Sequence, residues 1–408
     1  MNRLMLNKQT FLSLLLFLTI PLLGFISAIY NIIKSNNRKL IYVIIALFFS
    51  VLTIKNPPIH DIYRYILRFD SINSISDIGL YTNDYFFDFL TLLFKNIEIP
   101  FYLIPTTFVF LTLLLILFSI DKFLNFYNTS KNKAFLIIIA TIIIANPINV
   151  SLGLRSHLAF ALVFYGLTNL FLTKKNYYIL YLILGFLTHT SSFLLILSYF
   201  LSKYFKPNKS TTIILALTSF LMSTVLLNFA FELPIISKTF STLSVYKEFD
   251  NLSDKSARGL IFYYIDITVK LSIIATYFLF YHFNKIYHSE KSLYFFINIL
   301  IILTFASSMS EIAFGRYSSY VAFFIVIILL FQTTRRVKIT KIILIGYLFF
   351  TLTVTNIYVN RNSIISGNYI ATSITPPLFL FLYSDEEYRK LLSNTNFDGY
   401  PISGPGSQ

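Results

Sequence analysis

Long apolar runs separated by short charged segments follow one another along most of the chain. A helix needs about 20 mainly apolar residues to cross the hydrocarbon of a bilayer. The pattern therefore predicts an all-α, polytopic integral membrane protein with eleven transmembrane elements, one of which could be re-entrant. These elements lie roughly at residues 10–30, 40–55, 100–119, 134–148, 154–173, 177–201, 211–231, 259–281, 293–311, 314–332 and 340–358.

The composition supports a membrane protein and excludes several other classes. Of the 408 residues, 56% are hydrophobic and 12% are charged, whereas soluble domains are about 25% charged. Cysteine is absent, which excludes disulfides and thiolate metal sites. The net charge of +15 does not indicate nucleic acid, because the basic residues are scattered through short loops between apolar segments.

The loops indicate how the chain is oriented. The loops 56–99 and 232–258 are long and hold ten of the 18 acidic residues, and the other loops are short and basic. The positive-inside rule places the short basic loops in the cytoplasm. We expect one transmembrane domain over residues 1–358, with the two long loops and a C-terminal tail, 359–408, on the outside.

Residues 177–201 form an unusual segment, because basic clusters flank it on both sides and His189 with a run of hydroxyls lies at its centre. Either one cluster breaks the charge rule, or the segment enters the membrane and returns with His189 near its tip. Ionisable residues at this depth face the protein interior and are candidates for function. His189 is a hydrogen-bonded core residue, a general base or a donor to an anionic substrate.

Two arginines stand close to the predicted outer face. Arg155 begins a span after Asn146-Pro147, and Arg316 follows Glu311 by five residues. A guanidinium binds phosphate oxygens as a bidentate fork and keeps its charge at any relevant pH. The structural alternatives are an interfacial arginine for Arg155 and an ion pair with Glu311 for Arg316. Asp266 and Lys270, one turn apart, predict a structural ion pair.

The segment after Pro57-Pro58 predicts a charged, aromatic helix in the first long loop. Asp61, Tyr65 and Arg68 share one face of that helix, and Arg64 lies one turn before Arg68. An amphipathic helix at the membrane surface is the structural alternative to a substrate-facing lip. The chain has no Walker A, Rossmann or HExxH motif and no convincing metal-binding pair, so we expect no cofactor and no metal.

The ordered set of these polar residues resembles the EpsG/Wzy-type polysaccharide polymerases of bacterial cell envelopes. The resemblance rests on the Asp61, Tyr65, Phe69 stretch, on Arg155 in GLRSHLAFAL, on His189-Thr190-Ser191 and on Arg316-Tyr317. It covers roughly residues 40–330.

The resemblance implies a GT-C-like, metal-independent glycosyltransferase of the cytoplasmic membrane whose site faces the outside. Its substrate would be an undecaprenyl-diphosphate-linked oligosaccharide within the lipid bilayer, and a flippase and a chain-length regulator would be partners. Because a diphosphate leaving group needs positive charge near the outer face, we expect Arg155 and Arg316 to bind it. Asp61 and His189 compete as the base, and Glu311 is a third candidate. The remaining substrate-binding candidates are Arg64, Tyr65, Arg68, Tyr246, Arg258, Glu311 and Tyr317.

Three other functions fit part of the sequence. An O-antigen ligase shares the lipid-carrier chemistry and a large outer loop. A flippase or other transporter would show matched halves with interrupted helices, which this sequence lacks. A membrane acyltransferase would need a stronger histidine-centred motif than His189 provides.

Overall fold

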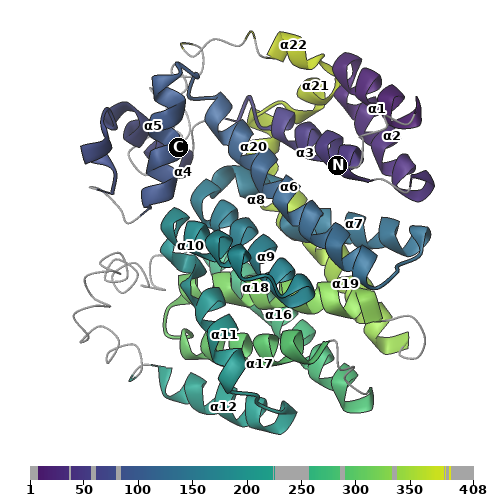
Figure 1. The fold of residues 1–408 in the computed structure, drawn as a ribbon, viewed down its shortest axis with the longest axis vertical. Helices are drawn as coiled ribbons and strands as arrows, with labels where there is room; N and C mark the ends of the chain where they lie inside the picture. Colours follow the sequence, from purple (N-terminus) through teal and green to yellow (C-terminus); the bar gives the residue numbers. More distant parts are fainter. Residues whose placement is uncertain are drawn as a thin grey trace. The chain divides into compact units, whose positions relative to one another are not determined.

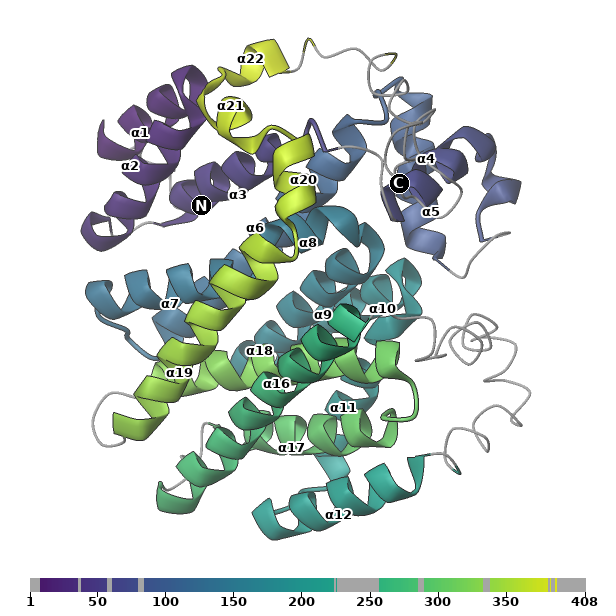
Figure 2. The same ribbon diagram turned by 180° about the vertical axis from the view of Figure 1, so that it is seen from behind.

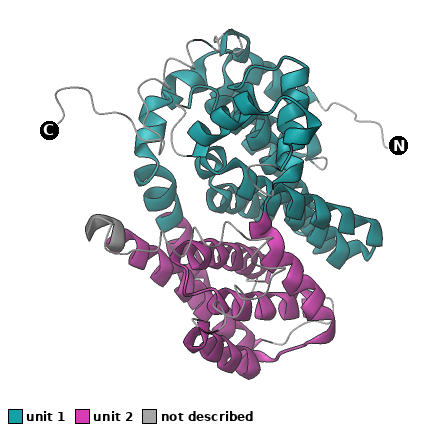
Figure 3. Ribbon diagram, turned by 90° about the vertical axis from the view of Figure 1, so that its left-hand side faces the viewer, with its two compact units in different colours: residues 1–189, 350–408 teal, residues 190–349 magenta. Residues whose placement is uncertain are grey.

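The computed structural model describes residues 8–35, 38–56, 61–79, 84–223, 225, 257–284, 290–332, 338–380, 382 and 386. Every regular element in these ranges is helical, which confirms the all-α prediction (Figures 1 and 2). The chain divides into two compact units, unit 1 with residues 1–189 and 350–408 and unit 2 with residues 190–349 (Figure 3).

Unit 1 contains both ends of the chain. Its elements are α1 (Lys8–Thr19), α2 (Pro21–Lys34), α3 (Lys39–Leu52), α4 (Asp61–Ser71), η1 (Ile75–Asp77), α5 (Tyr85–Asn96), α6 (Leu103–Phe126), α7 (Lys131–Ala145), α8 (Pro147–Leu152), α9 (Leu154–Thr173), η2 (Asn176–Tyr178), α10 (Ile179–Thr188), the π-helix η6 (Thr351–Tyr358), α20 (Arg361–Ser366), α21 (Tyr369–Ile374) and α22 (Pro377–Leu380).

Unit 2 contains the middle of the chain. Its elements are η3 (Thr190–Ser192), α11 (Phe193–Tyr204), α12 (Lys209–Leu221), α16 (Ala257–Phe283), α17 (Lys291–Ala306), α18 (Glu311–Gln332) and α19 (Lys338–Phe350), of which the last residue belongs to unit 1.

Among the described residues, six helical stretches are long and apolar enough to cross a membrane. They are Leu103–Phe126, Lys131–Leu152, Leu154–Thr173, Ile261–Phe283, Glu311–Gln332 and Ile339–Tyr358. Each coincides with a predicted span, so a helical membrane protein is supported. The count of eleven spans and the GT-C-like architecture stay predictions, as do the sidedness of the loops and the single transmembrane domain.

The prediction of one continuous span at 10–30 is wrong. The helix breaks before Pro21, and α1 and α2 fold back on each other, with Ser13 Oγ 2.8 Å from Ser27 Oγ and 2.8 Å from the Asn31 amide nitrogen. Proline favours the first position of a new helix, where its missing N–H costs nothing. Gly24 allows the close approach, because a Cβ there would lie 2.4 Å from the backbone of Phe17.

The core of unit 1 is built on α6 and α9, which lie side by side, with α10 packed on α9 (Figure 1). Gly185 in α10 makes this second contact close, because a Cβ there would lie 2.5 Å from Val163 and 3.0 Å from the Ala159 carbonyl oxygen. The end of α10 is therefore held against the first half of α9. The chain then departs from helical geometry at His189, with φ −163° and ψ 130°, which interrupts the predicted segment 177–201. The path of that segment through the membrane stays a prediction.

The two regions predicted as an outer loop and a tail contain ordered helices. In the loop 56–99, α4 confirms the charged, aromatic helix expected after Pro57-Pro58. In the tail 359–408, the described part forms α20, α21 and α22, and α21 packs against α2 and α3.

Unit 2 is organised around α17, which contacts α11, α12 and α18, while α16 packs against α18. Asn298 provides a polar contact inside this bundle: its amide donates to the Pro207 carbonyl at 3.0 Å and accepts from the Tyr277 hydroxyl at 3.0 Å. Side-chain hydrogen bonds of this kind hold helices together where lipid supplies little hydrophobic driving force.

Candidate active site

A buried carboxylate, Asp84, joins four separate segments of unit 1. Its Oδ2 accepts hydrogen bonds from the guanidinium of Arg155 on α9 and, at 3.4 Å, from Nη1 of Arg68 on α4. Its Oδ1 lies 3.0 Å from Nδ1 of His189, directly after α10. Asp84 itself immediately precedes α5 and is only 2% exposed. The arrangement brings two cations and an imidazole to one anion.

The α4 and α5 helices are fixed to each other by the fork of Arg68. One end of the guanidinium binds Asp84, and the other binds Asp88, one turn further along α5. The backbone N–H of Gly79, which has a φ of 77°, donates to Asp88 Oδ2 at 3.0 Å. Burial raises the pKa of Asp88, and the Arg68 charge opposes that rise. Arg68 and Asp88 therefore form an ion pair in a site of low polarity.

Arg68 is buried because it lies on the apolar face of helix α4. Ile62, Tyr65, Ile66 and Phe69 are buried, and Arg68 lies on the same side of the helix. The apolar residues anchor the helix, and the aliphatic part of Arg68 follows them inward. This packing aims its guanidinium at the two carboxylates.

Tyr65 links the buried cluster to the surface of α4. The Arg155 guanidinium lies 5.1 Å from the centre of the Tyr65 ring, and its Nε donates to the Tyr65 hydroxyl at 3.4 Å. The hydroxyl in turn donates to Asp61 Oδ2 at 3.4 Å. Burial raises the pKa of Tyr65 to about 12, so the residue is a neutral phenol at physiological pH and is a donor rather than a base.

Asp61 and Arg64 lie at the outer edge of this cluster. Their charged groups are 3.8 Å apart, and their side chains are 42% and 58% exposed, respectively. An exposed pair of this kind contributes little stability, about 0–1 kcal/mol. Both side chains are accessible to a large substrate.

The Asp84–His189 contact sets the protonation geometry of the imidazole. An ionised carboxylate only accepts, so Nδ1 of His189 must carry the proton. In a neutral imidazole, Nε2 is then the atom with the free lone pair. With this tautomer Nε2 is the atom that can accept a proton, and the His189 side chain is 15% exposed.

The structure brings together six of the predicted site residues: Asp61, Arg64, Tyr65, Arg68, Arg155 and His189. Glu311, Arg316 and Tyr317 belong to unit 2 on α18, where Tyr317 is buried and the other two are half-buried. Tyr246 lies outside the described residues, and Arg258 belongs to α16 in a turn whose side chains are not described. Their roles stay predictions.

Also in unit 2, the predicted ion pair between Asp266 and Lys270 is confirmed. Lys270 Nζ also donates to the Gly315 carbonyl at 3.3 Å. This bond ties α16 to α18 next to Arg316.

Sequence reasoning missed Asp84 and Asp88. Both belong to the acidic loop 56–99, which contains six acidic residues, so an acidic residue there is not distinctive by itself. Their i, i+4 spacing at the start of an amphipathic helix was the available signal, because it places two carboxylates on one helix face. Within the described ranges, no group of three or more His, Cys, Asp or Glu residues is arranged to hold a metal ion.

The comparison with known families matches the EpsG family over residues 54–370. This chain belongs to the EpsG family. The match includes every residue of the Asp84 cluster, from Asp61 to His189, and also Arg316. No curated protein and no solved structure matches the chain. Membership in the EpsG family, with the apolar helices, identifies a membrane protein of the polysaccharide polymerase type.

Proposed function

We propose that this EpsG-family protein is a metal-independent glycosyltransferase that polymerises polyprenyl-diphosphate-linked oligosaccharide repeat units at the outer face of the bacterial cytoplasmic membrane. The observation that supports the proposal is the Arg155–Asp84–His189 contact, in which a guanidinium and an imidazole share one carboxylate. Glycosyl transfer from a lipid diphosphate needs a ligand for the phosphate and a base for the acceptor, and we assign these roles to Arg155 and His189.

The reaction moves the growing chain from one lipid carrier to the next unit. The bond between the anomeric carbon and the diphosphate oxygen breaks, and the acceptor hydroxyl oxygen forms the new glycosidic bond. His189 Nε2 takes the hydroxyl proton, and the diphosphate leaves with the electron pair of the broken bond. No external energy source is needed, because the lipid diphosphate is itself the activated donor.

Arg155 supplies directed positive charge for the leaving diphosphate. Its contacts with Asp84 and Tyr65 use two of the five N–H donors of a guanidinium, and its side chain is 18% exposed. Preorganised donors aimed at developing negative charge are usually the largest single contribution to catalysis. Arg316 belongs to unit 2, and its role as a diphosphate ligand stays a prediction.

In the buried cluster the two positive charges of Arg68 and Arg155 face the two carboxylates of Asp84 and Asp88 before substrate binds. A diphosphate therefore meets oriented N–H groups rather than a large net charge. Exposed Arg64 adds positive charge at the edge of the cluster. Asp61 beside it is the alternative base.

The experiment is polymerisation by the purified protein in detergent or nanodiscs, with one lipid-linked repeat unit as donor and acceptor. We expect a ladder of products that lengthens with time and disappears in Arg155→Ala. Transfer only to a different lipid acceptor would indicate a ligase. Transbilayer movement of the repeat unit without any polymer would indicate a transporter, and either result would overturn the proposal.

A further inference from the structure

Unit 2 contains an apolar pocket that has no part in the proposed reaction. It has a volume of about 470 Å³, within the range of about 300–1,000 Å³ that small-molecule sites occupy. Its lining comes from the three helices α12, α16 and α17: Lys209, Ile213, Ala216, Leu217, Leu271, Ile274, Ala275, Phe278, Leu279, Ile301 and Phe305.

The lining of the pocket combines buried and exposed apolar side chains with one lysine. Ile301 of α17 is fully buried, whereas Leu217 of α12 and Leu279 of α16 are 56% and 52% exposed. Exposed apolar side chains of this kind are suited to hydrocarbon and not to water. Lys209, the first residue of α12, is the one charged residue among the lining side chains.

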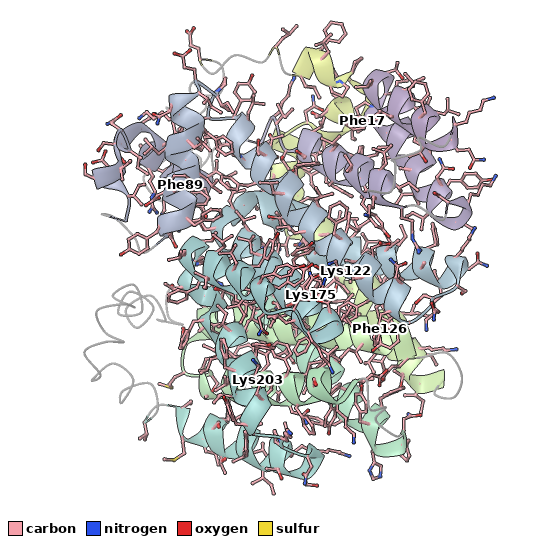
Figure 4. All side chains as sticks on the ribbon, viewed as in Figure 1. Phe17, Phe89, Lys122, Phe126, Lys175 and Lys203 are labelled. Carbon is pink, nitrogen blue, oxygen red and sulfur yellow. The ribbon has the colours of Figure 1, made fainter. Side chains whose placement is uncertain are left out.

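The chain around Lys209 is basic. Lys203 and Lys206 precede it, and residues 190–231 contain no Asp or Glu. Lys203 lies near the end of α11, shortly before the chain turns into α12 (Figure 4). The positive-inside rule predicts the cytoplasmic side for this loop, where the membrane surface is rich in anionic lipid.

We propose that this pocket binds one anionic phospholipid, with an acyl chain between α12 and α16 and the headgroup phosphate at Lys209. The apolar lining selects a hydrocarbon chain, and the lysine at the end selects a negative headgroup. The site lies wholly within unit 2 and is independent of the Asp84 cluster. Its occupant would stabilise the packing of α12 and α16 around α17.

The test is native mass spectrometry of the full-length protein in a mild detergent, titrated with phosphatidylglycerol or phosphatidylcholine of identical acyl chains. We expect saturable binding of one phosphatidylglycerol and at least fivefold weaker binding of phosphatidylcholine. Lys209→Ala should weaken the binding of phosphatidylglycerol about fivefold. This factor corresponds to the roughly 1 kcal/mol that one lysine contributes near an anionic surface.

Two matched pairs of variants make the test specific. Lys209→Ala is compared with Lys206→Ala, an exposed lysine in the same loop that does not line the pocket. Ala275→Phe fills the pocket from an exposed position on α16, and Ser272→Phe adds the same ring to an exposed position outside it. The first member of each pair should lose lipid, and the second should keep it.

Three outcomes would overturn the proposal. Equal binding of the two lipids would show a hydrocarbon contact without headgroup recognition. Unchanged binding in both Lys209→Ala and Ala275→Phe would place the lipid elsewhere. Stoichiometric replacement of phosphatidylglycerol by a polyprenyl phosphate at equal concentration would assign the pocket to the carrier.

Discussion

Asp84 binds His189 through one carboxylate oxygen and Arg155 through the other. The two partners come from the end of α10 and the start of α9, and the close α9–α10 contact at Gly185 holds them in register. A single buried carboxylate therefore fixes both the tautomer of the proposed base and the direction of the proposed phosphate ligand.

The first prediction is that Asp84→Asn lowers the rate of polymerisation about 100-fold or more while the protein still folds. An amide accepts through one atom only, so His189 loses its fixed tautomer, and general base catalysis contributes about 10²–10⁴ in rate. The measurement is the initial rate of product formation at saturating lipid-linked substrate.

The control for this substitution is Asp77→Asn, which alters a half-buried acidic residue of the same loop whose carboxylate accepts from Asn73 and Ser74 and not from the cluster. The double variant Asp84→Asn/His189→Ala should be at most about threefold slower than His189→Ala alone, because the effects of two residues that act together do not add. Fully multiplicative losses would show that Asp84 does not act through His189.

The second prediction is that Arg155→Lys impairs catalysis although it conserves charge. A lysine cannot bind Asp84 and a phosphate with one planar fork. We expect a loss of about 10–100-fold in kcat/KM, since hydrogen bonds to charged groups contribute about 1.5–3 kcal/mol. Arg64→Lys, at the exposed edge, should change the same ratio by less than about threefold, and a similar loss in both variants would argue against a special role for Arg155.

The helices and most of the candidate residues could be predicted from the sequence, because apolar runs of membrane length and isolated polar residues within them are local signals. Arg155 and His189 stood out for this reason. The break between α1 and α2 could not be placed from hydropathy alone, since both helices are apolar and only Pro21 marks the turn.

The centre of the site could not be predicted, because it depends on contacts between segments that are far apart in the chain. Asp84 and His189 are separated by 105 positions, and the spacing of charges within one loop carries no information about that contact. Asp61 was a candidate because it shares one helix face with Tyr65 and Arg68, a pattern that is visible in the sequence. In the structure it lies at the exposed edge of the cluster.

The third prediction concerns stability. Arg68→Met should destabilise the protein by about 3–5 kcal/mol, because removing one partner of a buried ion pair leaves the charge of the other unpaired. Arg68 faces both Asp84 and Asp88, so its removal takes the arginine away from Asp88 and leaves Asp84 with Arg155 alone. The measurement is denaturant unfolding in detergent, with Arg64→Met as the exposed control. Equal stability of the two variants would contradict the buried fork.

The fourth prediction distinguishes the two candidate bases. Asp61→Asn should retain activity within about threefold, whereas His189→Ala should lose about 100-fold or more. Asp61 is paired with exposed Arg64, while His189 is oriented by a buried carboxylate. The comparison requires equal expression and the same lipid-linked substrate. The reverse order of the two losses would make Asp61 the base and reduce His189 to a structural partner of Asp84.

The fifth prediction is a pH dependence with a definite sign. Burial raises the pKa of Asp88 in the folded state above its unfolded value, which is about 3.9 for an ordinary aspartate. A raised pKa contributes stability that is present below the unfolded value and is lost as the pH rises through the folded value. Wild type should therefore lose stability relative to Asp88→Asn as the pH increases from about 4 towards neutrality. The measurement is the unfolding midpoint of both proteins across that range. If the wild type instead became more stable relative to the variant as the pH rises, the charge of Arg68 would outweigh burial at Asp88.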